Sequence, residues 1–295
     1  MVATNNQRTG ILLLLAISVL FGANHVCARL AFDAGASVAT AVSVRSSFTA
    51  LFLVLLLRLQ GVALLPRPGL RLRALGVGLL VSLQSYCLYS AVKLIPVGIA
   101  LLVFQTVPLI YVVLSAVTGR ERIRSSALVA MPVALVGLAL ALNLRPDDLA
   151  SAGRELGPGI AWAFSAALCF TVVMYANAYW VKDVDGRVRT LSAMTVAAVV
   201  LSIAGAATGG HALPQGTAGY AGLILLTLLY GTAITSLFIL LPRLAGGAAA
   251  TIALNTEPLA ALVLAWVVLG QAIAPIQMLG ALVVVSAIVF MAVRR

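Results

Sequence analysis

Residues Ala248–Leu269 read AAATIALNTEPLAALVLAWVVL, an apolar segment that carries one carboxylate, Glu257, near its middle. About 20 apolar residues in a helix cross the hydrocarbon core of a bilayer, so this segment is long enough to be a membrane span. A charged side chain at membrane depth is costly and usually has both a partner and a functional role. Glu257 is therefore the first candidate for function.

The whole chain has the composition of a multi-span membrane protein. Of its 295 residues, 62% are hydrophobic and only 9% are charged, whereas soluble domains have about 25% charged residues. The length suits about ten spans with short loops, and we expect an all-α membrane protein without a separate soluble domain. The formal charge of +11 does not indicate nucleic-acid binding, because the basic residues lie at the ends of apolar runs.

Runs without charged residues mark the expected spans, and the interval from Asn143 to Gly159 reads as a loop. The uncharged stretch Thr190–Pro242 is long enough for two spans, which the segment Gly209–Gly216 divides. The other spans are expected at Gly10–Ala28, Ala36–Leu57, Ala74–Val92, Val97–Thr118, Ser125–Leu142, Gly159–Val181 and Ala248–Leu269, and from Pro275 to the end of the chain.

Lysine and arginine are distributed unequally between the two sides of this arrangement. With the N-terminus inside, 14 of them fall on inner segments and four on outer ends, while Arg45 lies within a span. The positive-inside rule then places both termini in the cytoplasm of a multi-pass inner-membrane protein. The run Gly10–Ala28 is too long for a signal-peptide core and is taken as the first span. Three cysteines scattered in apolar runs give neither a disulfide framework nor metal spacing, so no metal or cofactor is expected.

An internal repeat relates the two halves of the chain. A shift of 150 positions aligns Val97–Arg124 with Gly247–Ala274 without a gap, and eight of 28 pairs are identical, including a Thr-x-Pro-Leu motif at Thr106 and at Thr256. We expect two five-span repeats, residues 1–150 and 151–295. Because five is odd, the second repeat enters the membrane inverted. Inverted repeats are typical of alternating-access transporters, whose substrate site lies near the midplane between the halves.

Several motifs resemble those of EamA-domain proteins in the drug/metabolite transporter superfamily. The segment from Phe21 to His25 is similar to their Trp-Gly-x-Asn motif, with Phe21 in place of Trp, and Arg45 lies where they often carry arginine. Their paired proline and Gly-Glu signatures resemble Pro108 with Gly119-Arg120-Glu121-Arg122, and Glu257-Pro258 with Leu269-Gly270-Gln271, where Gln271 replaces Glu. This full-length resemblance implies ten spans in two inverted repeats and export of amino acids, other metabolites or drugs.

The charged and titratable residues at depth are the sharpest candidates for chemistry. Glu257 is expected to bind a cationic group, pair with an arginine or exchange a proton, and the alternative is a structural ion pair. Arg45 lies at similar depth, which suggests an Arg45–Glu257 pair in at least one state. The alternatives for Arg45 are bonds to backbone carbonyls or snorkelling to the outer surface. His25 is a candidate proton relay, although a lone histidine is more often a packing residue.

Other residues at depth are candidates for binding or gating. The prolines Pro108 and Pro258 are predicted to act as hinges, or else as fixed kinks that shape packing. Polar and aromatic side chains are expected to line a substrate pathway, and the alternatives are clips between helices and core packing: Asn24, Gln84, Gln105, Asn255, Tyr86, Trp162, Tyr175 and Tyr230.

Together these features predict a transporter that exports a small organic metabolite, an amino acid or related compound, by alternating access. A multidrug or organic-cation exporter is the alternative, with Glu257 holding the positive charge. A membrane enzyme or accessory subunit is a further alternative, although nothing in the sequence resembles a catalytic set. The expected partners are a small-molecule substrate and the lipid bilayer, with no nucleic acid, and the fifth and tenth spans are possible homodimer surfaces.

Overall fold

The computed structural model describes residues 2–120, 125–143, 153–240, 257, 259–260 and 274–293. In these ranges the secondary structure is helical, and no strand occurs among them. The helices are α1 (Val2–Asp33), α2 (Val38–Leu59), α3 (Pro68–Leu94), α4 (Val97–Phe104), α5 (Val107–Val117), α6 (Ser125–Ala141), α8 (Leu156–Tyr179), α9 (Gly186–Ala207), α10 (Gly216–Leu240) and α12 (Pro275–Val293), with a 3₁₀ turn at Gly153–Glu155.

Six helical segments of the described chain are long and apolar enough to cross a membrane: Val38–Leu59, Pro68–Leu94, Val97–Val117, Gly153–Tyr179, Gly186–Ala207 and Gly216–Ile234. The predicted division of the uncharged stretch is confirmed, because α9 ends at Ala207 and α10 begins at Gly216. Of the expected span Ala248–Leu269, only Glu257, Leu259 and Ala260 are described, so the predicted roles of Asn255 and Pro258 fall outside the described residues.

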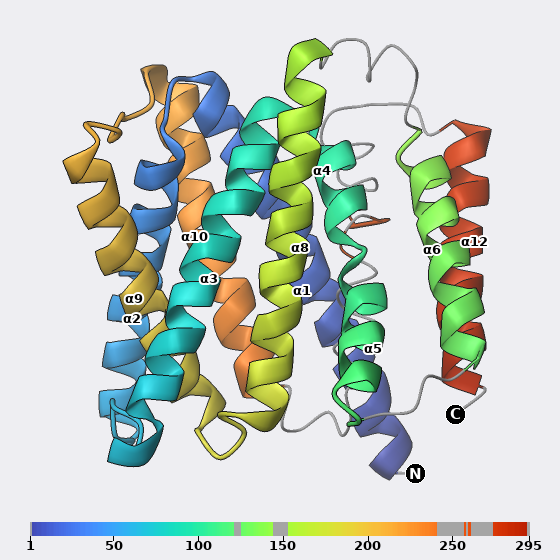
Figure 1. Ribbon diagram of the computed structural model, residues 1–295, viewed down its shortest axis with the longest axis horizontal. Helices are drawn as coiled ribbons and strands as arrows, with labels where there is room; N and C mark the ends of the chain where they lie inside the picture. Colours follow the sequence, from blue (N-terminus) through green and yellow to red (C-terminus); the bar gives the residue numbers. More distant parts are fainter. Residues whose placement is uncertain are drawn as a thin grey trace.

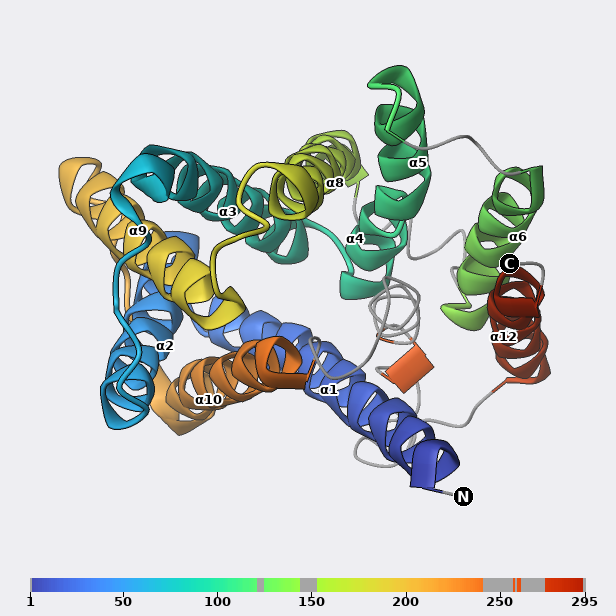
Figure 2. The same cartoon turned by 90° about the horizontal axis from the view of Figure 1, so that it is seen from below.

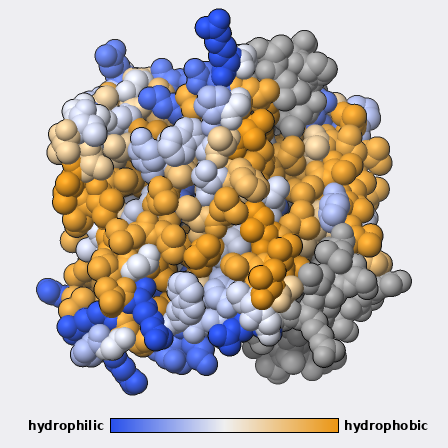
Figure 3. All heavy atoms as spheres, viewed as in Figure 1, coloured by the Kyte–Doolittle hydropathy of each residue, from blue (hydrophilic) through white to orange (hydrophobic). Residues whose placement is uncertain are grey.

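The surface fits a membrane environment. Figure 3 shows a broad hydrophobic band across the middle of one face, with hydrophilic residues gathered toward its upper and lower edges. Large apolar side chains point outward along the helices, among them Leu51, Val136 and Ile203. A soluble monomer rarely exposes so much contiguous apolar surface, whereas a bilayer solvates it.

Local sequence explains where α2 and α9 begin. Ser37 Oγ accepts a hydrogen bond from the Thr40 backbone N–H at the start of α2. Asp185 accepts one from the Arg187 backbone N–H at the start of α9. These caps satisfy backbone donors that the first helical turn leaves unpaired.

The span Val97–Val117 is interrupted between α4 and α5. Proline has no N–H, so Pro108 leaves the carbonyl of Phe104 without its normal partner one turn later. Helix α4 accordingly ends at Phe104, and α5 begins at Val107, with Pro108 in its first turn. The loosening of the helix expected at this proline is therefore present, and its use as a hinge stays a prediction.

Helices of the two halves pack against each other in pairs. Helix α1 packs against α10, α2 against α9, α3 against α8 and α6 against α12, as Figures 1 and 2 show from two directions. Exchanging equivalent helices of the two halves converts the α1–α10 pair into the α8–α3 pair. In Figure 1, α1 begins at the lower edge and α8 at the upper edge, so the halves start in opposite directions. Both features are those of an inverted repeat.

Candidate functional site

Polar side chains, all buried except the partly buried Tyr230, gather where α1, α2 and α3 face α10. We call this group the polar cluster, and it consists of Asn24 and His25 from α1, Arg45 from α2, Ser85 and Tyr89 from α3, Tyr230 from α10, and Glu257. It joins residues from the first half of the chain to residues from the second half.

Arg45 is the cation of the polar cluster, and its side-chain contacts are neutral. Its Nη1 donates to Tyr89 Oη at 2.7 Å, and its Nη2 donates to Ser85 Oγ at 2.8 Å. Its Cζ lies 3.7 Å from the ring centroid of Tyr230, a cation–π contact. The residue is 2% exposed, and its Nε has no hydrogen-bond partner in the described part of the chain.

Helix geometry places these partners around Arg45. Ser85 and Tyr89 are four residues apart on α3, so both lie on one face of that helix. Gly231 allows α10 to approach α2, because a Cβ there would lie 3.2 Å from Thr49 Oγ1. This approach brings the neighbouring Tyr230 onto the guanidinium of Arg45.

Tyr89 connects Arg45 to α1. Its Oη lies 2.9 Å from Asn24 Nδ2 and 3.2 Å from Asn24 Oδ1, and both residues are 1% exposed. Its ring centroid is 5.9 Å from that of His25. The predicted site residue Gln84 is also buried nearby and accepts a long hydrogen bond of 3.5 Å from Ser85 Oγ.

Glu257 is paired with His25. The Nε2 atom of His25 lies 2.9 Å from Oε1 of Glu257, and the two residues are 5% and 7% exposed. This contact needs a proton on the imidazole nitrogen or on the carboxyl group. The Nδ1 atom of His25 has no partner among the described residues.

The expected Arg45–Glu257 pair is therefore not the arrangement in this structure. The acid contacts a histidine, and the arginine contacts two hydroxyl groups. The two residues were matched by their depth in the membrane, and depth does not determine which face a helix turns toward its neighbours. The alternative of an arginine bonded to backbone carbonyls also differs from the arrangement in this structure, since both acceptors of Arg45 are side-chain hydroxyl groups.

Three of the predicted aromatic residues lie apart from the polar cluster. Tyr86 of α3 and Trp162 of α8 form an edge-to-face pair with ring centroids 5.8 Å apart. Tyr175, near the other end of α8, accepts a hydrogen bond of 3.4 Å from Arg120 Nε. Its ring centroid lies 4.7 Å from that of Tyr179. Only Tyr230 of the four predicted aromatic residues belongs to the polar cluster, so the described residues form no single aromatic wall.

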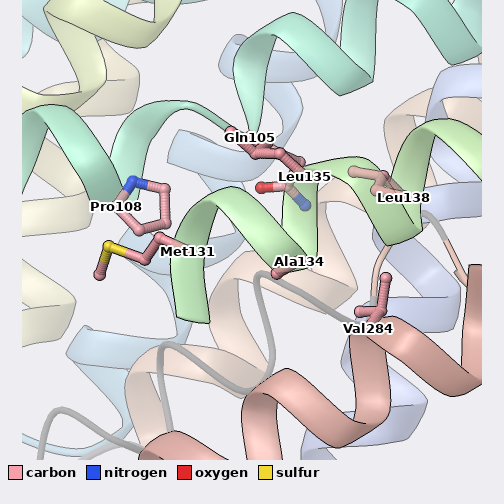
Figure 4. Close-up of a pocket in the computed structure, with 7 residues that line it drawn as sticks. All are labelled: Gln105, Pro108, Met131, Ala134, Leu135, Leu138 and Val284. Atoms are coloured by element: carbon pink, nitrogen blue, oxygen red, sulfur yellow. The ribbon is translucent and has the colours of Figure 1, made fainter. Parts of the chain in front are cut away.

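Gln105 and Pro108 line a separate pocket beside α6. Figure 4 shows them facing Met131, Ala134, Leu135 and Leu138 of α6 and Val284 of α12. The cavity volume is about 20 Å³, enough for roughly one water molecule. Among the described residues, the break between α4 and α5 therefore borders a small void beside α6.

Sequence reasoning missed Ser85 and Tyr89 as members of the site. Neither carries a charge, and the same span contains other serine and tyrosine residues, so residue type alone does not distinguish these two. The available signal was their four-residue spacing, which places two hydroxyl groups on one helical face at the depth of Arg45.

Comparisons with known proteins agree with this architecture. The sequence pattern described as the EamA-like transporter family matches residues 8–143 and again residues 157–293. A solved structure titled "Crystal structure of protein" superposes with a TM-score of 0.76 at 18% identity, covering 97% of each chain, and shows the fold alone. No curated protein matches the sequence. Because the two family matches span most of the chain, the protein belongs to the EamA-like transporter family.

Proposed function

We propose that the protein is a secondary transporter that exports a small organic metabolite, an amino acid or related compound, by alternating access. The observation that carries this proposal is the polar cluster, which holds buried charges of both signs between the two halves of the chain. Intramembrane charges are rare, and substrate and ion pathways are among the functional sites that they mark. In inverted-repeat transporters the substrate lies at this interface, where movement of one half against the other changes its access.

The proposed orientation has both termini in the cytoplasm of the inner membrane, with ten spans in repeats 1–150 and 151–295. In Figure 1, the ends of α2, α5 and α8 and the starts of α3 and α9 lie at the lower edge, as does the start of α1. These ends carry Arg58, Arg67, Arg71, Arg73, Arg120, Lys182, Arg187 and Arg189. The positive-inside rule assigns such a face to the cytoplasm.

Two further proposals concern movement and assembly. Pro108 is proposed as a hinge, because the helix of this span is interrupted between Phe104 and Val107, one turn before and beside the proline. Unchanged transport rates in a Pro108→Ala variant would contradict that role. A homodimer formed through α6 and α12 stays a prediction, which the mass of the purified protein in detergent would test.

A multidrug or organic-cation exporter is the second candidate. The buried carboxylate Glu257, with the aromatic Tyr230 nearby in the same cluster, is the observation that favours it. Hydrophobic cations are bound by such groups in other proteins. A non-transporting enzyme or accessory subunit would instead show no vectorial movement of any solute by the purified protein.

The test is a transport panel with purified protein in liposomes. Amino acids, other small carboxylates and organic cations are each offered with and without a pH gradient, to wild type and to a Glu257→Gln variant. We expect wild type to move an amino acid or related compound and Glu257→Gln to move it much more slowly. If wild type moves only cations, the drug-exporter alternative is correct. If it moves nothing above empty liposomes, the transport proposal fails.

A further inference from the structure

Arg45 is a buried cation whose described contacts include no anion. Its two terminal nitrogens donate to the hydroxyl groups of Tyr89 and Ser85, and the ring of Tyr230 covers one face of the guanidinium. Hydroxyl groups satisfy hydrogen bonds but carry no counter-charge. Burying a cation in a low-dielectric environment without a counter-charge costs free energy. We therefore expect an anion to bind Arg45 in some state of the protein.

Glu257 does not fill this role in the structure. Its carboxylate lies against His25 Nε2, which joins it to α1 rather than to Arg45. The other two ion pairs of the described chain, Arg29 with Asp33 and Arg187 with Asp185, lie outside the cluster near helix ends. The missing anion is therefore not supplied by a described carboxylate.

The guanidinium retains an unused donor. The Nε atom of Arg45 has no partner among the described residues, although the side chain is 2% exposed. Guanidinium groups present N–H donors in a planar fork that matches the two oxygens of a carboxylate. The hydroxyl groups and Tyr230 fix the plane of this fork in advance, so little side-chain entropy is lost when an anion binds.

We propose that Arg45 is the carboxylate-binding group of the transport site, held in place by Ser85, Tyr89 and Tyr230, and that the transported compounds carry a carboxylate. This inference rests on the proposed function and names its substrate class. A site built on Arg45 selects amino acids and other organic acids over hydrophobic cations, because the buried positive charge of Arg45 repels cations. Access to Arg45 comes from movement between the first-half helices α1–α3 and the second-half helix α10.

The experiment uses matched compounds in liposomes that contain the purified full-length protein. Export of the best-transported compound of the panel is competed with three analogues that share one side chain: the amino acid, its uncharged carboxamide, and the acid without the amino group. For wild type, we expect both carboxylates to compete and the carboxamide to be weaker by at least about 100-fold, as expected where a buried polar group is left unpaired.

Substitutions test whether Arg45 is responsible for the preference for the carboxylate over the carboxamide. In Arg45→Gln, the ratio between acid and carboxamide is expected to fall toward one, whereas Glu257→Gln keeps the wild-type ratio. The control is Arg29→Gln, which removes an arginine that pairs with Asp33 and donates to backbone carbonyls at the end of α3, outside the polar cluster, and it also keeps the ratio. If Arg45→Gln does not fold, Arg45→Lys and Ser85→Ala keep the charge and alter only its geometry, and a reduced ratio is expected in both.

The outcomes separate the two proposals. Competition by the carboxamide as strong as that by the acid in wild type overturns the assignment of Arg45, while the transport proposal stands. A wild-type ratio that survives in Arg45→Gln also overturns it. Absence of any transport by wild type removes the proposed function and this inference together.

Discussion

Helices α2 and α9 occupy equivalent places in the two halves and differ in one respect that matters for function. Each has 22 residues, each begins with a side-chain cap, and they pack against each other. Helix α9 begins 148 positions after α2, and α10 begins 148 positions after α3. At that spacing Arg45 of α2 corresponds to Ala193 of α9, which is buried and apolar.

The same asymmetry occurs with the opposite sign in the fourth span of each half. The 150-residue repeat pairs Glu257 with Val107, and both are buried. Each half thus supplies one charge at a position where the other half has an apolar residue. The two halves therefore share a family pattern and differ in the charged residue that each contributes to the polar cluster.

The largest effect is expected from removing the buried charge of α2, that of Arg45. Arg45→Gln should lower transport by at least about 100-fold, because the substrate loses its charged partner. The control in α9 is Ser192→Ala, next to the equivalent position Ala193, which removes a hydroxyl bonded to the Val188 carbonyl of its own helix, and it should leave transport nearly unchanged. Flux per folded protein is the measurement. Equal losses in both variants would show that the two helices are functionally equivalent.

A smaller loss is expected when the support of Arg45 is removed and the charge remains. Tyr89→Phe deletes the hydroxyl that binds Arg45 and Asn24, and leaving such buried groups unsatisfied costs about 1–3 kcal/mol. Both transport and the unfolding temperature should fall. The control is Tyr86→Phe on the same helix, since Tyr86 is exposed and contacts Trp162 through its ring. A Tyr86→Phe loss as large as that of Tyr89→Phe would contradict the importance of the cluster.

Contacts between equivalent helices should matter for stability rather than for substrate choice. A Cβ at Gly280 would overlap the backbone of Ala141 and Gly137, where α12 meets α6. Gly280→Ala is therefore expected to destabilise the protein by about 1–3 kcal/mol. At Gly76 of α3 an added Cβ meets nothing within 4 Å, so Gly76→Ala should be neutral or slightly stabilising. Thermal unfolding in detergent separates the two, and an unchanged Gly280→Ala midpoint would argue against close α6–α12 packing.

The smallest effect concerns the caps of α2 and α9. Hydrogen bonds from Arg187 hold the pKa of Asp185 below its usual value near 3.8, so its stabilisation is present above that value and is lost as the pH falls through the lowered pKa. The cap contributes about 1 kcal/mol. Ser37 has no ionisable group, so the α2 cap does not depend on pH. Thermal unfolding below about pH 4 should be less sensitive to pH in Asp185→Asn than in wild type; identical pH dependence would contradict this assignment.

The positions of six spans in the described chain could be predicted from the sequence because charge and apolar length determine which segments enter a bilayer. The broken span was also predictable, since Pro108 removes a backbone donor wherever its helix packs. The family followed from short motifs around Asn24 and Glu257, and the matches to residues 8–143 and 157–293 confirm it.

The partners of the charges could not be predicted in the same way. Their similar depth suggests that Arg45 and Glu257 pair. Which side chains meet also depends on the rotation of each helix about its own axis, and this rotation is set by packing such as that at Gly231. The same holds for Tyr175. Its depth predicts a place in the substrate pathway, whereas in the structure its hydroxyl accepts a hydrogen bond from Arg120. Uncharged groups such as Ser85 gain their role only from the neighbour that packing gives them.

The central claim is that substrate crosses the membrane at the polar cluster, and protection of Ser85 tests it most directly. Cys27, Cys87 and Cys169 are replaced by alanine, and Ser85 by cysteine, in protein reconstituted into liposomes. The rate of modification by a membrane-permeant maleimide is then measured with and without a saturating transported compound. We predict that the compound slows modification in proportion to its occupancy. A rate that the compound does not change, in protein that still transports it, would contradict the placement of the site.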